Sequence, residues 1–166
     1  MNKTTKKIAI AAVLLAIGLV LPKVFHLFGP EVSKLLSPLH LPAFFAGFLL
    51  GGPYGLLVGV ILPLLSSILT AMPPLVPMGV SMAFEIGTYG LMSGLLSKKM
   101  NVYFALILAI VSGRVMFSIV QSLLLGFTSM NQWWTLLTSN FVSGAVAIIF
   151  QLVLIPILVT RLKKVL

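Results

Sequence analysis

Two ionisable residues in apolar stretches, Glu85 and Arg114, are the side chains whose chemistry most needs an explanation. Glu85 lies in MGVSMAFEIGTYGLMSGLL and Arg114 in ALILAIVSGRVMFSIVQSLLLG, both of which are suited to lipid. Glu85 is also one of only two acidic residues in the chain, the other being Glu31. A charged side chain in a membrane is costly unless it faces the protein interior or a wet cavity and has a partner. We therefore expect Glu85 and Arg114 to lie close together.

The composition indicates a protein that lies almost wholly in a membrane. Hydrophobic residues make up 60% of the chain and charged residues 8%, against roughly 25% charged residues in soluble domains. Helices of about 20 residues are needed to cross a bilayer, so six of them would use most of the 166 residues. We expect an all-α integral membrane protein with one domain, 1–166, and six transmembrane helices near 6–22, 37–51, 53–71, 78–97, 102–123 and 135–160.

The basic residues predict the orientation of these helices. With the N-terminus inside, only Lys23 and Lys34 fall outside and Arg114 lies within the membrane. The eight others are cytoplasmic: Lys3, Lys6, Lys7, Lys98, Lys99, Arg161, Lys163 and Lys164. This bias follows the positive-inside rule and predicts that both termini are cytoplasmic in a multi-pass protein of the bacterial plasma (inner) membrane. Because the cations cluster at the ends of apolar segments, the net charge of +9 does not indicate nucleic-acid binding.

Polar residues converge in the outer half of the membrane under this orientation. At 1.5 Å per residue, Glu85, Arg114 and Asn140 lie about 10, 12 and 8 Å from the outer ends of their segments. Residues spaced by three or four share one helix face, which adds Tyr89 to Glu85 and Gln121 to Arg114. The residues predicted to line an outward-facing polar pocket are Glu85, Arg114, Asn140, Tyr89, Gln121, Ser81, Ser67 and His40.

Simpler interpretations of the same residues stay open. A buried Glu85–Arg114 pair could serve only to fix helix packing, and serine hydroxyls often bond to their own helix backbone. His40 could be an interfacial histidine, and Trp133 and Trp134 are typical of the aromatic belt of a membrane protein.

Small residues at a spacing of four occur twice, at Ala12 and Ala16 and at Gly55 and Gly59. Such pairs let helices approach closely. Each pair could serve internal packing or docking to another membrane subunit.

The sequence lacks the motifs of an enzyme or of a complete pump. It has no phosphate-binding loop for ATP, no His-Glu-x-x-His and no cysteine. We therefore predict that the chain is not an enzyme, that it holds no metal or other cofactor, and that any ATP is used by partner subunits. An outward pocket without its own energy source is typical of a capture subunit.

The run from Leu39 to Leu96 resembles the substrate-binding S components of energy-coupling factor (ECF) vitamin transporters. The resemblance is carried by LHLP, AG, GPYG, PLLS and MPP in that order, followed by FE, YG and the later GR. It implies a subunit of an ECF-type ABC transporter that captures a water-soluble vitamin or precursor. It also implies a membrane T component and two cytosolic ATPases as partners, with Ala12 and Ala16 contacting the T component.

The resemblance identifies the family more specifically than it identifies the substrate. The resemblance and the possible role of Arg114 as a carboxylate partner favour pantothenate, with a pyridoxine-type ring next. Folate would need more cationic and aromatic lining than the sequence offers. The alternative to transport is a structural membrane subunit of a larger complex, which would have a tight polar pair and no solute-sized cavity beside it.

Overall fold

The computed structural model describes residues 2–164, in which the regular elements are helices and there is no strand. The helices are α1 (Lys3–His26), α2 (Pro30–Leu36), α3 (Leu41–Leu50), α4 (Gly52–Thr70), α5 (Val80–Leu96), α6 (Val102–Leu124), α7 (Met130–Ser143) and α8 (Ala145–Leu162). A 3-10 turn (Pro38–His40) leads into α3, and an irregular turn (Leu75–Gly79) leads into α5.

Five of these segments are long and apolar enough to cross a membrane: Lys3–His26, Gly52–Thr70, Leu75–Leu96, Val102–Leu124 and Ala145–Leu162. The segment Pro38–Leu50 is a shorter apolar helix. Together they fall on the six segments expected from the sequence. The expected all-α membrane fold is confirmed.

The first outer connection contains more helix than the sequence analysis expected. Helix α1 continues through Pro22 to His26 instead of ending at residue 22. A proline in a membrane helix is tolerated because its surroundings can satisfy the backbone groups that it frees. Helix α2 then begins at Pro30, since proline suits the first position of a helix.

The last expected segment, 135–160, consists of two helices that meet at Gly144. Helix α7 begins at Met130, five residues before the expected start, because Ser129 and Gln132 form a capping box. The Ser129 hydroxyl accepts a hydrogen bond from the Gln132 backbone N–H at 3.3 Å. Trp133 and Trp134, which precede the expected start of this segment, therefore lie in the first turns of α7.

Glycines bring α3, α4 and α5 into close contact. A methyl group added at Gly55 would collide with the backbone of Gly90, and one at Gly90 would collide with Gly55. Gly59 lies in the same way against the backbone of Ile86. The Gly55–Gly59 pair therefore serves packing within the chain.

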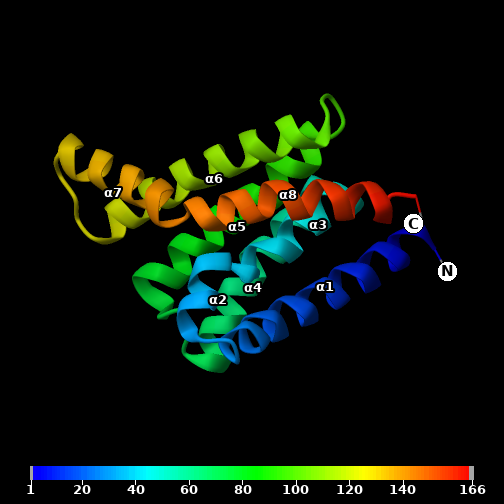
Figure 1. Ribbon diagram of the computed structural model, residues 1–166, viewed down its shortest axis with the longest axis horizontal. Helices are drawn as coiled ribbons and strands as arrows, with labels where there is room; N and C mark the ends of the chain where they lie inside the picture. The colour runs from blue at the N-terminus through cyan, green and yellow to red at the C-terminus, as the bar shows by residue number, and fades with distance from the viewer. Residues whose placement is uncertain (1, 165–166) are drawn as a thin grey trace.

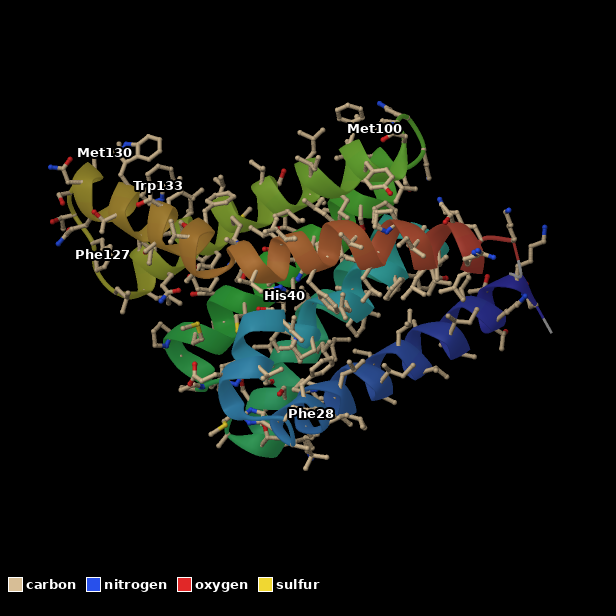
Figure 2. The ribbon with its side chains drawn as sticks, in the orientation of Figure 1. Phe28, His40, Met100, Phe127, Met130 and Trp133 are labelled. Carbon is tan, nitrogen blue, oxygen red and sulfur yellow. The ribbon has the colours of Figure 1, made fainter. Side chains whose placement is uncertain are left out.

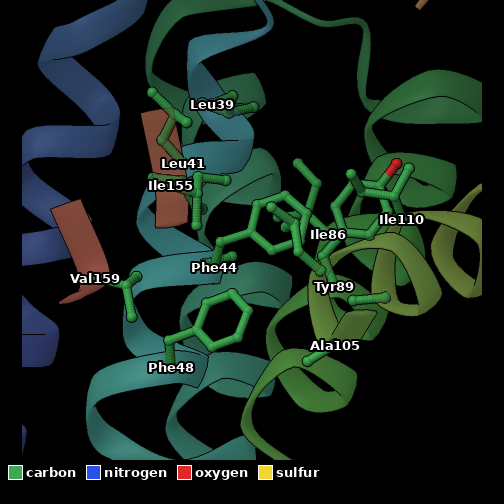
Figure 3. Packing of buried hydrophobic residues seen from close by; sticks show 14 residues of the cluster. Leu39, Leu41, Phe44, Phe48, Ile86, Tyr89, Ala105, Ile110, Ile155 and Val159 are labelled. Carbon is green, nitrogen blue, oxygen red and sulfur yellow. The ribbon is translucent and has the colours of Figure 1, made fainter. Parts of the chain in front are cut away.

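The apolar core lies between α3, α5, α6 and α8 (Figure 3). The rings of Phe44 and Tyr89 stack at its centre, with centroids 4.8 Å apart and planes 17° apart. Ile86 and Ile155 are also fully buried there.

The start of α1 and the end of α8 lie at the same end of the molecule (Figure 1). Met100, in the α5–α6 connection, lies toward this end, whereas Phe127 and Met130 lie at the opposite one (Figure 2). The predicted cytoplasmic segments therefore share one end of the molecule, and α7 lies at the end expected to face outside. Helix α1 packs loosely, with only Gly18 buried.

Candidate functional site

Glu85 of α5 and Arg114 of α6 form a buried ion pair, with Arg114 Nη1 3.2 Å from Glu85 Oε1 and side chains 8% and 3% exposed. The Tyr89 hydroxyl, one turn along α5, donates a hydrogen bond to the same carboxylate oxygen at 2.6 Å. Buried charges are tolerated when they are paired and hydrogen-bonded. The structure thus brings together the two residues whose burial demanded a partner, and adds Tyr89 to them.

Gly113 lets α5 and α6 come close enough for this contact. A methyl group at Gly113 would collide with the Tyr89 ring and would lie 2.9 Å from the Glu85 carbonyl oxygen. Because Gly113 directly precedes Arg114, the close approach places the guanidinium within reach of Glu85. Sequence reasoning did not single out Gly113, although a glycine next to an intramembrane arginine indicates that another helix can approach closely there.

The break between α7 and α8 lies against the same guanidinium. A methyl group at Gly144 would collide with Arg114 Nη2 and would lie 2.9 Å from Cζ. The end of α7 carries the negative end of a helix dipole, which favours a nearby cation. The missing side chain of Gly144 therefore makes room for Arg114.

Four buried side-chain atoms in the described part of the chain have no hydrogen-bond partner: Ser67 Oγ, Arg114 Nε, Gln121 Oε1 and Asn140 Nδ2. All four belong to residues expected to line a pocket. Such atoms are rare in native structures, and each costs about 1–3 kcal/mol when it is left unpaired. Arg114 and Asn140 supply unpaired donors, whereas Gln121 supplies an unpaired acceptor.

Arg114 and Asn140 are brought into one region through Gly144. Asn140 lies one helical turn before Gly144, and the Gly144 N–H donates to the Asn140 carbonyl at 3.1 Å. The guanidinium of Arg114 packs on Gly144 itself. Three helices, α5, α6 and α7, therefore contribute to one polar cluster, which we define as Glu85, Tyr89, Arg114 and Asn140.

His40 lies near the middle of the molecule (Figure 2). Its ring meets that of Tyr89 edge-on, with centroids 5.4 Å apart, and its Nδ1 lies 3.3 Å from Gln151 Nε2. His40 also lines a cavity of about 210 Å³ together with His26, Ser33, Ser66 and Met82. It is buried, and it contacts both that cavity and Tyr89 of the polar cluster.

The two serines predicted for the site have different surroundings. Ser81 is fully buried on the same face of α5 as Glu85, but its hydroxyl donates to the Pro77 carbonyl at 2.8 Å. Ser67, at the end of α4, lies against Gly79 at the start of α5. Neither is joined to the Glu85–Arg114 pair by a hydrogen bond in the described structure.

Ala12 and Ala16 lie exposed on α1, apart from the polar cluster. Their face of the helix is not covered by the rest of the described chain. It is therefore accessible to a partner within the membrane.

These features define a multi-pass membrane protein with a buried polar site and an accessible first helix. The family model for the substrate-specific component of ECF transporters matches residues 6–159, and the chain belongs to this family. Neither the comparison with curated proteins nor that with solved structures gave a match.

Membership of this family fixes the general role of the chain. It is the substrate-specific subunit of an ECF transporter in the cell membrane, where it associates with a membrane T component and ATPases and takes a small-molecule substrate. Subunits of this kind bind the substrate of the transporter and are not enzymes.

Proposed function

We propose that this subunit captures a water-soluble vitamin or precursor that carries a carboxylate, with pantothenate as the first candidate, from the outer face of the membrane. The observation that carries the proposal is that Arg114 Nε and Asn140 Nδ2 are both buried and both lack a hydrogen-bond partner, while the Arg114 guanidinium packs against Gly144, one turn after Asn140. Two donors on adjacent helices, both without an acceptor, suit a ligand that brings an acceptor of its own.

The chemistry of arginine supports a carboxylate as that acceptor. Glu85 pairs with Nη1 of Arg114. The Nε and Nη2 atoms of the guanidinium are therefore left to bind another group. Arginine binds carboxylates through two parallel N–H donors, and these charge-assisted bonds are stronger than neutral ones. The unpaired acceptor Gln121 Oε1 suits the hydroxyl or amide N–H groups that pantothenate also carries.

The aromatic residues favour pantothenate over a pyridoxine-type ring. Phe44 and His40 already pack against the ring of Tyr89, at 4.8 and 5.4 Å between centroids. These three rings lie in the core, where they pack against one another. A planar vitamin would need a free ring face to stack on, and this group offers none.

Binding to the purified protein tests the proposal. Thermal stability would be measured with pantothenate, with pantothenol, in which an alcohol replaces the carboxylate, and with pyridoxine. A ligand at 100 times its Kd stabilises a protein by about 2.7 kcal/mol. Losing the bond to a charged group costs about 1.5–3 kcal/mol, so we expect pantothenol to bind roughly 10- to 150-fold more weakly.

Two matched variants are compared. Arg114→Gln should remove the preference for pantothenate over pantothenol. Arg161→Gln should keep this preference because Arg161 is exposed at the end of α8. Equal binding of pantothenate and pantothenol would overturn the carboxylate proposal, and preferred binding of pyridoxine would replace it. If no vitamin binds, the Glu85–Arg114 pair is a packing device. Transport in proteoliposomes with the T component and ATPases would then test whether captured pantothenate is imported.

A further inference from the structure

An apolar groove lies along α1 and is lined by side chains of α1, α3 and α8. It encloses a cavity of about 340 Å³, and the side chains that line it are all apolar. Leu14 and Leu21 line it from α1, and Leu154 and Leu162 line it from α8. No function assigned above uses this groove.

A second cavity, of about 350 Å³, lies at the N-terminal end of α1 and has a different lining. Lys3, Lys6 and Lys7 line it together with Ile10 of α1 and Leu49 of α3. The Nζ atom of Lys7 lies 5.6 Å from the centroid of the Tyr54 ring, which holds this cation beside the start of α4.

The two cavities follow one another along the same face of α1. At 100° per residue, the lining residues of α1 fall within a sector of about 100°: Lys3, Lys6, Lys7, Ile10, Leu14, Ile17 and Leu21. This face therefore begins with cations at the end expected to be cytoplasmic and continues as apolar side chains toward the outside.

The charge around the cytoplasmic end of the groove has one sign. Helix α8 ends beside the start of α1 (Figure 1) and brings Arg161, Lys163 and Lys164 to the same end of the molecule as the three lysines of α1. The two acidic residues of the chain, Glu31 and Glu85, lie in other helices, α2 and α5. A ligand of this end should carry negative charge.

We propose that the groove binds an anionic phospholipid of the cytoplasmic leaflet, with its phosphate at the lysines of α1 and one acyl chain between α1, α3 and α8. Clusters of lysine and arginine at the membrane surface attract anionic headgroups. The face from Lys7 to Leu21 is about 21 Å long, enough for the roughly 15 Å of one hydrocarbon leaflet.

The lipid and the T component would use opposite faces of α1. Ala12 and Ala16 each lie about 160° around the helix from Leu14. A lipid bound in the groove therefore leaves the exposed alanine face free, and it fills the space that separates this loosely packed helix from α8. This arrangement favours a lipid over a partner helix as the occupant of the groove.

Native mass spectrometry of the purified full chain in mild detergent tests the proposal. The protein would be titrated with phosphatidylglycerol or phosphatidylcholine carrying the same acyl chains. We expect one phosphatidylglycerol molecule to be retained at least tenfold more tightly than phosphatidylcholine. The variant Lys3→Gln/Lys7→Gln should lose this preference, whereas Lys98→Gln/Lys99→Gln, two cytoplasmic lysines at the α5–α6 connection, should keep it.

A third variant tests the groove itself. Leu158→Trp fills the space between α8 and α1 and should prevent retention of the lipid, with helix content and size-exclusion profile as folding controls; if it does not fold, Ile17→Phe takes its place. Ala12→Leu, on the opposite face of α1, should leave retention unchanged.

Equal retention of the two lipids would overturn the proposal. So would an equal loss of the preference in both lysine variants, since that would indicate non-specific attraction to the cytoplasmic surface. A dimer of this chain that excludes the lipid would identify a second copy as the occupant instead.

Discussion

Replacing both members of the Glu85–Arg114 pair separates its structural role from its role in binding. Arg114→Met leaves the carboxylate of Glu85 buried with only the Tyr89 hydroxyl as a donor, and Glu85→Met leaves the guanidinium buried without its counter-ion. The double variant Glu85→Met/Arg114→Met removes both charges and keeps side chains of comparable length. We expect each single variant to be unstable and the double variant to regain stability without regaining ligand binding.

The magnitudes follow from the burial of the pair. Removing one partner of a buried ion pair costs about 3–5 kcal/mol, whereas replacing both by apolar residues is often neutral or stabilising. In the double variant the Tyr89 hydroxyl loses its acceptor, which costs about 1 kcal/mol or somewhat more. Since 1 kcal/mol shifts the unfolding temperature of a chain of this size by about 2–4 °C, the single variants should unfold roughly 6–20 °C lower and the double variant within about 5 °C of the parent.

Thermal unfolding in detergent, followed by helical circular dichroism, measures the first quantity, and titration with pantothenate measures the second. A double variant as unstable as the single variants would refute the coupling between the two charges. A stable double variant that still binds pantothenate would show that the pair only holds α5 against α6, and the proposed carboxylate site would have to be abandoned.

Three further variants probe the surroundings of the pair. Tyr89→Phe removes the hydrogen bond to Glu85 but keeps the aromatic packing, so unfolding should become easier by about 1.5–3 kcal/mol; unchanged stability would mean that the hydroxyl is dispensable. Gly144→Ala places a methyl group against the guanidinium of Arg114 and should weaken pantothenate binding at least tenfold in an equilibrium titration, a result at odds with a purely structural break. Ser81→Ala should leave that titration unchanged because the Ser81 hydroxyl already bonds to the Pro77 carbonyl in the turn that leads into α5, and a tenfold loss would instead place Ser81 in contact with the ligand.

The Glu85–Arg114 contact could be predicted because a buried charge is costly, and only a few arrangements of the side chains around it are stable. The chain has one intramembrane carboxylate and one intramembrane guanidinium, so each needed the other or a wet cavity. The six apolar segments could be predicted for a related reason, since lipid requires long apolar helices. In both cases the membrane narrowed the range of structures open to the chain.

The division of the last segment at Gly144 was beyond sequence reasoning. Glycine is frequent in membrane helices and usually does not break them. Here the break coincides with the packing of Arg114, which comes from a different helix. The approach of His40 to Gln151 was equally inaccessible, because it joins residues 111 positions apart through the tertiary fold. The early start of α7, by contrast, could have been predicted from the sequence, because Ser129 and Gln132 have the spacing of a capping box.

The distribution of close packing indicates which part of the site can move. Glu85 and Tyr89 belong to α5, which glycines bind tightly to α3 and α4. Asn140 belongs to α7, in which only Leu137 is buried and which ends at the Gly144 break. A carboxylate held by both Arg114 and Asn140 would draw the end of α7 toward the rigid part of the molecule, because Arg114 is already anchored there by Glu85. Binding of the ligand should therefore order α7 more than α3–α5, and hydrogen exchange that falls equally in both would argue against a ligand shared by Arg114 and Asn140.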